Sequence, residues 1–529
     1  MRRTALRLGV PRTSLRRDER RFDAMDAAPA ARVFFDSPEG QLWVHRLVVV
    51  LLLVVVVWGS LGVEKVQFVL HVVGLDRRLA CSRTHLQERS QRLQGLIREF
   101  GQEEGSRASA AMVARTITLC ADEMWMAHTM VLVANDPVSG YLFVQKIAAT
   151  RDEGTWTEVV QEARTGLALT IRTAVTDQAK ALIAMAQNGL DVVHVAELFH
   201  GQHELTGACA RRLAVRVRAA QTAHDEAVAA SRTLRAEHRA EVVGERGPGR
   251  PRDWDHALAV AQKVQQRTEG ALRRARADQE GMREAVQGLS AVLHPVDLTT
   301  GQGQDADTVE AALERHLARA QGIATRLGTR SVAAVESVRK LVPTWAALVA
   351  AWREAVQNRL TAERLTAELL TLVFSVLIPA LYLDWIRARN HVGAAERTRL
   401  TAVRDELLAK VRTDTAWTAL SAERRAALVA LAQECAQWFV RCTGSTEGHN
   451  GWLRLHFTHL HRVTPEWLET QRVLHNFLLR RPDGTTAAER FFGIAPGDLL
   501  EYLVARMPLP ALPRRRATSK PDDLTRLHL

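Results

Sequence analysis

Hydrophobic and polar residues alternate in short runs between residues 115 and 205, and this pattern predicts a small sheet. Runs rich in β-branched residues and bounded by turn residues are typical of strands, whereas a 3.6-residue period is typical of helices. The predicted strands are residues 116–123, 128–135, 141–148, 167–175 and 191–195, with helices at 155–163 and 178–188. Three hairpin-linked strands followed by helix, strand, helix and strand indicate a five-stranded mixed α/β sheet.

The strand pattern stops after this sheet, and residues 205–440 are almost wholly helical by periodicity. The Gly- and Pro-rich stretch 244–251 divides a long segment into two arms, each about 55 Å long at 1.5 Å per residue. We therefore expect an antiparallel helical hairpin around residues 207–290. Residues 443–505 are mixed but mainly helical by the same pattern.

The N-terminal part contains an uncharged apolar run, residues 47–63, which lies at the lower length limit for a membrane span. A second apolar stretch covers residues 369–383. The first run continues into a helical pattern that breaks at Gly74, and a further helix is predicted from about Thr84. Helix, turn and helix form the outline of a helix-turn-helix. This continuation favours a buried helix, and a membrane-anchored helical protein using residues 47–63 is the alternative.

The charge balance points to a polyanionic partner. The chain of 529 residues has 71 Lys and Arg against 59 Asp and Glu, a formal net charge of +12. Such an excess favours nucleic acid or an anionic surface as the partner. Eight arginines fall within the first 21 residues, where a flexible phosphate-binding arm is expected. The arginines predicted to contact DNA there are Arg2, Arg3, Arg16, Arg17, Arg20 and Arg21.

The five cysteines are scattered and form no CxxC pair. This spacing excludes a disulfide scaffold and argues against a structural zinc site. A reducing compartment fits best, so a cytoplasmic location is expected.

Two acids lie at predicted strand ends. Asp122, with Glu123 beside it, ends the first strand, and Asp177 follows the fourth strand. Side chains at strand ends of a mixed sheet project into a common crevice, where carboxylates can share divalent metals. Neighbours on a strand face opposite ways, so only one of Asp122 and Glu123 can enter that crevice, and we choose Asp122. The alternative for Asp177 is a plain helix cap before Gln178.

Several stretches together resemble insertion-sequence transposases of the DDE type. They are Asp122-Glu123, residues 132–142 (LVANDPVSGYL), Arg151-Asp152, Thr155-Trp156, 175–182 (VTDQAKAL), 197–204 (ELFHGQHE), 445–455 (STEGHNGWLRL), His475-Asn476 and 481–492 (RPDGTTAAERFF). These motifs occur in the order of that family and cover about 115–205 and 440–516.

The resemblance implies an RNase-H-like fold, and DNA cleavage and strand transfer with two Mg²⁺ or Mn²⁺ ions. Carried over residue by residue, Asp122, Asp177 and Glu447 match the catalytic and metal-binding triad. The 270 residues between Asp177 and Glu447 imply a large all-helical insertion in the α/β core. Double-stranded DNA, both the element's terminal repeats and the target, is the implied partner. A homo-oligomer on DNA in the nucleoid is expected, and a membrane partner is not.

These inferences divide the chain into six parts. They are a basic arm (1–40), a helical, helix-turn-helix-like DNA-binding region (41–110), the first catalytic part (115–204), the helical insertion (205–440), the remaining catalytic part (441–505) and a basic tail (506–529). The rival interpretation is an inactive, transposase-derived DNA-binding protein. Metal-dependent nicking of terminal-repeat DNA separates the two.

Four further residues have candidate roles. His200 and His203 are one helical turn apart, which permits a zinc pair, although a structural or phosphate-positioning role is favoured. Arg454 follows Glu447 by seven residues and would share its helix face, where it could bind a phosphate or form a surface ion pair. Asn450 is three residues after Glu447 and could orient it.

Overall fold

The computed structural model describes residues 29–126, 128–244, 252–389, 392–457 and 463–511, together with Pro11, Thr13 and Arg16. The described part is mostly helical and contains one five-stranded mixed sheet. The predicted contacts of Arg2, Arg3, Arg17, Arg20 and Arg21, and most of the basic tail, lie outside the described residues.

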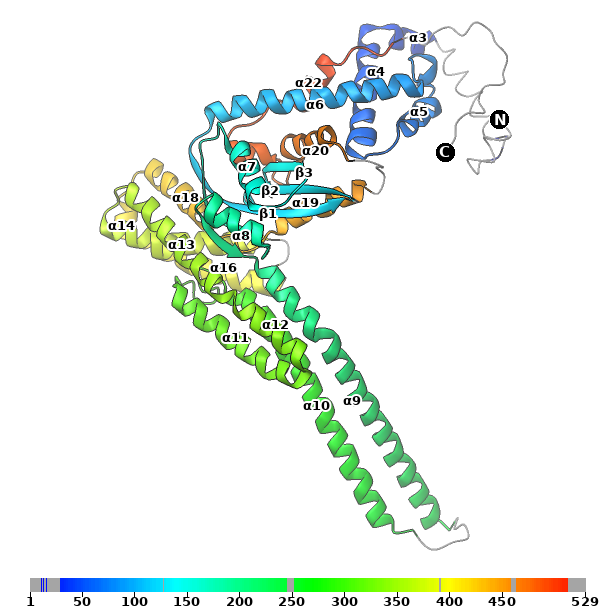
Figure 1. Cartoon of the computed structure of the whole chain (residues 1–529), viewed down its shortest axis with the longest axis vertical. Helices are drawn as coiled ribbons and strands as arrows, with labels where there is room; N and C mark the ends of the chain where they lie inside the picture. Colours follow the sequence, from blue (N-terminus) through cyan, green and yellow to red (C-terminus); the bar gives the residue numbers. More distant parts are fainter. Residues whose placement is uncertain are drawn as a thin grey trace. The chain divides into compact units, whose positions relative to one another are not determined.

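The sheet has the strand order β3-β2-β1-β4-β5. Figure 1 shows β3, β2 and β1 side by side. All five strands fall within a few residues of the predicted runs: β1 (Arg115–Met126), β2 (Thr129–Asn135), β3 (Leu142–Ala148), β4 (Leu169–Thr176) and β5 (Val193–Ala196). β2 pairs with β3 in the antiparallel sense, and β4 pairs with β5 in the parallel sense. The predicted mixed α/β sheet is therefore confirmed.

β1 and β4 run in the same direction. The amide of Arg115 donates to the carbonyl of Ala168 over 3.0 Å, and further along both strands the hydroxyls of Thr118 and Thr173 are 2.9 Å apart. Since both contacts advance along the two strands together, the pair is parallel. The central strand β1 thus lies between β2 and its parallel neighbour β4.

The chain divides into two compact units. The first contains Met1–Thr116, Ala121–Thr170 and Gly444–Leu529, and the second contains Ile117–Cys120 and Ile171–Thr443. This division differs from the six predicted parts, because most of β4 and all of β5 group with the helical insertion. The N-terminal helices group instead with β2, β3 and the C-terminal helices.

The first unit has helices from both ends of the chain. They are α3 (Pro29–Asp36), α4 (Pro38–Leu51), the π-helix η1 (Leu52–Trp58), α5 (Val63–Val72), the 3-10 helix η2 (Leu75–Arg77), α6 (Arg83–Ala111), α7 (Glu153–Arg164), α19 (Gly444–Phe457), α20 (Pro465–Phe477), α21 (Ala487–Phe492) and α22 (Leu499–Arg506). α6 carries buried Leu86, Leu93 and Phe100, and the Phe100 ring meets Phe477 of α20 edge-on at 5.7 Å. The two chain ends therefore share one core.

The apolar run 47–63 forms the end of α4 and all of η1. Val48, Leu52 and Val57 are buried, and η1 packs on α6. Gly74, with φ of +76°, follows α5 at the predicted break. Among the described residues, two helices are long and apolar enough to cross a membrane, Pro38–Trp58 and Ala367–Arg387. In their most apolar windows, 44% and 56% of the residues are buried. Such helices also occur in the cores of soluble proteins, so this finding does not favour the membrane alternative.

The second unit is helical apart from its strands. Its helices are α8 (Lys180–Ala184), the π-helix η3 (Met185–Gly189), α9 (Leu198–Val242), α10 (Trp254–Val292), α11 (Ala306–Leu327), α12 (Thr329–Arg339), α13 (Val342–Ala362), α14 (Ala367–Leu372), the π-helix η4 (Val373–Leu377), α15 (Ile378–Arg387), α16 (Ala394–Thr413), α17 (Thr415–Thr418) and α18 (Ala422–Gln437). The indole of Trp345 in α13 donates to the carbonyl of Ala196 in β5 over 2.8 Å. This bond ties the helices to the sheet.

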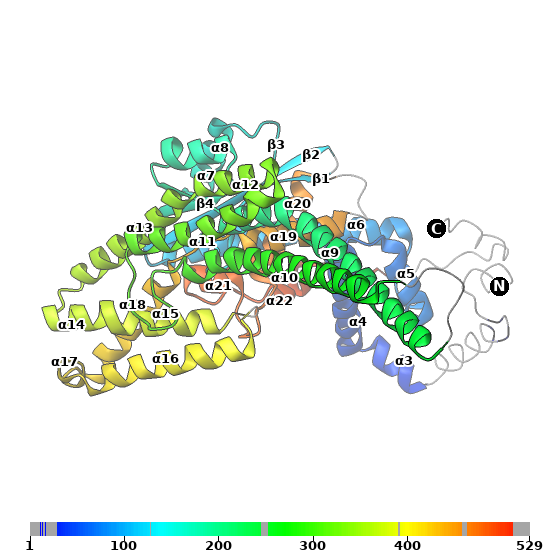
Figure 2. The same cartoon turned by 90° about the horizontal axis from the view of Figure 1, so that it is seen from below.

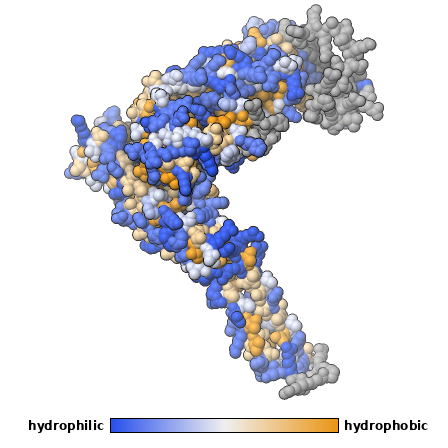
Figure 3. Space-filling view, viewed as in Figure 1, coloured by the Kyte–Doolittle hydropathy of each residue, from blue (hydrophilic) through white to orange (hydrophobic). Residues whose placement is uncertain are grey.

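α9 and α10 form the predicted antiparallel hairpin, with the two helices side by side (Figures 1 and 2). α9 begins at Leu198, so the predicted domain boundary at 204 lies inside a continuous helix. Along the hairpin, hydrophilic residues are interspersed with hydrophobic ones on the visible face (Figure 3). This mixture is expected where two helices bury only a narrow seam.

Candidate active site

Asp122 lies on β1, four residues beyond Thr118, and is half-buried. It lies inside the strand and not at its end as predicted, because β1 continues to Met126. Its Oδ1 accepts a hydrogen bond from the amide of Glu123 over 2.8 Å, and its Oδ2 accepts one from Nδ2 of Asn450 over 2.7 Å. The neighbouring Glu123 instead forms an ion pair with Arg151. The two adjacent acids thus have different partners, as expected for neighbours on a strand.

α19 lies on β1, β2 and β3 of the first unit through a line of polar contacts. Thr446 donates to Oδ1 of Asn135 on β2 over 2.6 Å, and Nδ2 of Asn135 donates to Ser445 over 2.9 Å. Further along α19, Asn450 reaches β1. These residues share one face of the helix, because positions four apart are neighbours on a helical surface.

A buried histidine completes this contact line. Nε2 of His449 bonds Oε1 of Gln145 on β3, while Nε2 of Gln145 donates to the carbonyl of Leu468 over 2.7 Å. Because Oε1 can only accept, Nε2 of His449 must carry the proton. Leu453, one turn later, is buried against Val131 and Val133. The helix is therefore fixed by both polar and apolar contacts.

Glu447 is positioned by this docked helix. It lies between Thr446 and Asn450, both buried, and is itself half-buried. Oδ1 of Asn450 is buried and has no hydrogen-bond partner among the described residues. The first unit thus brings Asp122 and Asn450 together and places Glu447 one helical turn away on the same helix.

Asp177 follows β4 in the second unit, four residues beyond Thr173, and is half-buried. Its Oδ1 accepts a hydrogen bond from the amide of Ala179 over 2.9 Å, just before α8. This contact closes a turn before the helix and is not the predicted cap, because the N-cap residue of α8 is Ala179 and no side chain caps that helix. It engages only one of the carboxylate's two oxygens, so it does not exclude a metal-binding role.

Glu197 is a buried carboxylate at the start of the motif 197–204, and no role was predicted for it. It is 1% exposed, accepts a hydrogen bond from the amide of Thr443 over 2.7 Å, and also bonds the Thr443 hydroxyl and Nδ1 of His200. Burial alone would raise the pKa of Glu197, but the bonds from His200 and Thr443 outweigh it and lower the pKa below its ordinary value. The carboxylate is therefore charged at neutral pH.

His200 and His203 have different neighbours. His200 bonds Glu197, whereas the ring of His203 stacks on Phe199 at 5.8 Å and is exposed. Arg454 is exposed on α19, and among the described residues no acid forms an ion pair with it. Among the candidate metal ligands, Asp122 and Glu447 lie in the first unit, and Asp177, Glu197 and His200 lie in the second.

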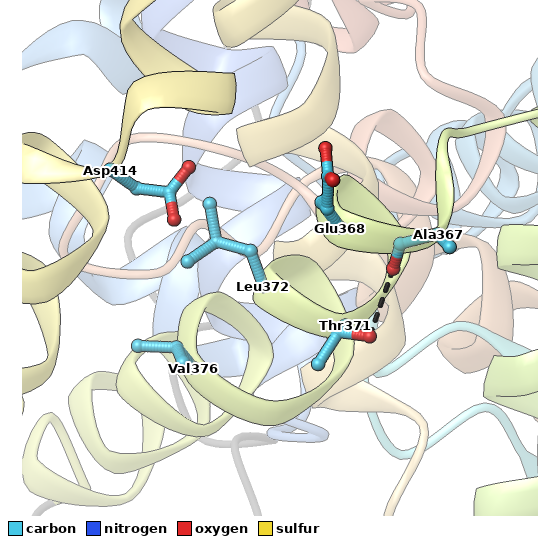
Figure 4. Close-up of a pocket in the computed structure, with 6 residues that line it drawn as sticks. All are labelled: Ala367, Glu368, Thr371, Leu372, Val376 and Asp414. Atoms are coloured by element: carbon cyan, nitrogen blue, oxygen red, sulfur yellow. Dashed lines mark hydrogen bonds between the residues drawn. The ribbon is translucent and has the colours of Figure 1, made fainter.

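One hollow on the surface of the second unit is lined by residues other than these candidates. It measures about 420 Å³ and is lined by Ala367, Glu368, Thr371, Leu372, Val376 and Asp414 (Figure 4). The Thr371 hydroxyl donates a hydrogen bond to the carbonyl of Ala367 over 2.9 Å. None of the predicted site residues lines it, so it gives no support to a small-molecule site at the acids.

The comparisons with known proteins give one match. Residues 373–519 match a family of unknown function (DUF6399). No curated protein and no solved structure matches the chain. The matched segment contains α19 with Glu447, α20 and α21.

Proposed function

We propose that the chain is a DDE transposase that cuts and joins DNA strands, with Asp122, Asp177 and Glu447 as its metal-binding acids. The observation that carries this proposal is the hydrogen bond between Asn450 and Asp122. Through it, the helix of the third predicted acid is docked on the strand of the first, although more than 300 residues separate them in the sequence.

The topology of the sheet also supports the proposal. The strand order β3-β2-β1-β4-β5, with an antiparallel β2–β3 hairpin and β4 parallel to β1, agrees with the RNase-H-like core that the resemblance implies. The long helical insertion follows β5 and ends before α19, where the resemblance predicts it.

The donor atoms fit Mg²⁺ or Mn²⁺. These ions prefer hard oxygen ligands. Asp122, Asp177 and Glu447 supply carboxylates, and the buried Oδ1 of Asn450 is an acceptor without a partner among the described residues. When bound, two such ions activate a water or a 3′-hydroxyl and stabilise the leaving oxygen.

The chain's own residues provide positioning and charge. Asn450 donates a charge-assisted hydrogen bond to one oxygen of Asp122. This bond orients the carboxylate before the substrate binds. Gln145, Asn135 and their partners hold α19, and so Glu447, on the sheet. The net charge of +12 favours binding to DNA phosphates.

Two experiments test the proposal. The DNA that borders the gene should carry inverted repeats, and a labelled duplex with those repeats should be nicked by the full chain in Mg²⁺ or Mn²⁺ but not in EDTA. Binding of this duplex without nicking in either metal would favour the inactive DNA-binding alternative. Absence of both binding and nicking would refute both.

A further inference from the structure

Three side chains from residues 475–490 bind the turn between β2 and β3. The proposed catalytic role of the acids does not explain these contacts. Arg481 donates from Nη1 to the carbonyl of Val138 over 3.1 Å, and Arg490 donates from Nε to the carbonyl of Ser139 over 2.9 Å. His475 donates to the carbonyl of Gly140 over 2.9 Å. Three successive carbonyls of one turn therefore have side-chain donors.

The two guanidinium groups converge outside this turn. A Cβ built on Gly140 would lie 3.2 Å from Nη2 of Arg481 and 3.8 Å from Nη2 of Arg490. Gly140 has φ of +79°, which favours glycine, and glycine leaves the space between the guanidinium groups open. Both Nη2 groups lie near one point, within reach of a single phosphate, whose oxygens accept from guanidinium nitrogens at about 2.7–2.9 Å.

The acids nearby do not satisfy these arginines. Asp136 accepts from the amides of Val138 and Ser139, and Asp483 accepts from Thr485. Among the described residues neither arginine forms an ion pair, and neither Nη2 has a hydrogen-bond acceptor.

The positions of both arginines are fixed before any ligand binds. Nη1 of Arg490 donates to the carbonyl and hydroxyl of Thr485 over 2.7 and 2.8 Å. Burial first, and then the charge of Arg481, lower the pKa of Arg490 to about 10, so both remain cations at neutral pH. Two like charges held close together are relieved by an anion between them.

We propose that Arg481 and Arg490 form a binding site for one backbone phosphate of DNA. The site itself is inferred from the geometry of the turn. That its ligand is DNA rests on the proposed function. A bidentate contact of this kind positions the duplex and carries no sequence information.

The test is the salt dependence of binding of a short labelled DNA duplex by the full chain. Arg481→Gln should lower affinity and make the slope of log affinity against log salt shallower. The change should be up to about 0.9, the full value for one lost phosphate contact, because Arg490 can still contact the phosphate. The matched control is Arg480→Gln, because Arg480 is an exposed neighbour whose Nη1 is bound to the carbonyl of Gly484. Thermal unfolding of both variants should match the wild type.

Arg490→Lys keeps the charge but loses the two-nitrogen geometry, and it should also weaken binding. If this variant does not fold, Arg481→Gln alone decides. Equal effects of Arg481→Gln and Arg480→Gln, or no effect of Arg481→Gln, would overturn the inference even if the wild type nicks DNA. A specific effect of Arg481→Gln in a chain that never nicks DNA would support the phosphate site and refute the transposase. A wild type that binds no duplex would overturn the phosphate site.

Discussion

The side-chain amide of Asn450 donates a 2.7 Å hydrogen bond to Oδ2 of Asp122, although 328 residues separate the two. Asn450 is 4% exposed, so this bond to a carboxylate is shielded from water and is worth more than a surface contact. It sets the orientation of Asp122 relative to α19, which carries Glu447.

Replacing Asn450 should therefore impair catalysis. Asn450→Ala removes the donor that holds Asp122, and loss of a partner that orients a metal ligand typically costs 10–100-fold in activity. We expect kcat for metal-dependent nicking to fall by about that factor, with little change in DNA affinity. The control is Asn358→Ala on the exposed face of α13. Nicking by Asn450→Ala at the wild-type rate would show that the bond is only structural.

Asp177→Asn separates a metal-binding role from a structural role in the turn before α8. Asparagine keeps an oxygen that can accept from the amide of Ala179, so the start of α8 should be preserved. The loss of negative charge should abolish nicking and leave DNA binding nearly intact. The matched control is Asp191→Asn, since Asp191 is exposed with φ of 53°, which asparagine tolerates. Cleavage by Asp177→Asn would show that Asp177 only stabilises the turn before α8.

The strands and long helices could be predicted because their determinants are local. The β-branched runs of β1 to β5 are bounded by turn residues, and Gly74 ends α5 where the pattern breaks. A local pattern also identifies Asp177 as the residue directly after a strand. The same pattern ends the first strand too early, because β1 continues to Met126 and Asp122 lies inside it.

The contacts that dock α19 could not be predicted in this way. Asn135 bonds Ser445 and Thr446 across about 310 residues, and no pattern near position 135 indicates such a partner. Likewise, the sequence places Glu197 in a motif but does not reveal that its carboxylate is buried against Thr443. Long-range pairing depends on the packing of the whole chain, and single-sequence patterns do not contain it.

Acid should destabilise the first unit through His449 and His475. Burial lowers the pKa of both below the ordinary 6.5, and their rings lie 4.8 Å apart, so a proton on either is costly. The folded state then binds fewer protons than the unfolded state below pH 6.5. Above pH 6.5 the free energy of unfolding should not depend on these two histidines' protonation. Below pH 6.5 it should fall by about 1.4 kcal/mol per pH unit for each histidine, until the pH reaches the folded-state pKa of that histidine.

Urea unfolding between pH 8 and pH 5 measures this loss. His449→Gln should lower stability at pH 8 but make its pH dependence shallower, because one buried titrating group is removed. His256→Gln, at an exposed position in α10, should leave the pH dependence unchanged. An equally steep loss in His449→Gln and the wild type would exclude His449 as a source of acid sensitivity.

Glu197 should contribute to stability through Thr443. Glu197→Ala would leave the amide and hydroxyl of Thr443, both buried, without their acceptor, and an unsatisfied buried donor costs about 1–3 kcal/mol. Glu197→Gln keeps one acceptor oxygen and should cost less. The control Glu226→Ala, exposed on α9, should change the free energy of unfolding by no more than about 0.5 kcal/mol. Equal stability of Glu197→Ala and Glu226→Ala in urea would show that Thr443 finds another acceptor, because the buried amide cannot remain unpaired at no cost.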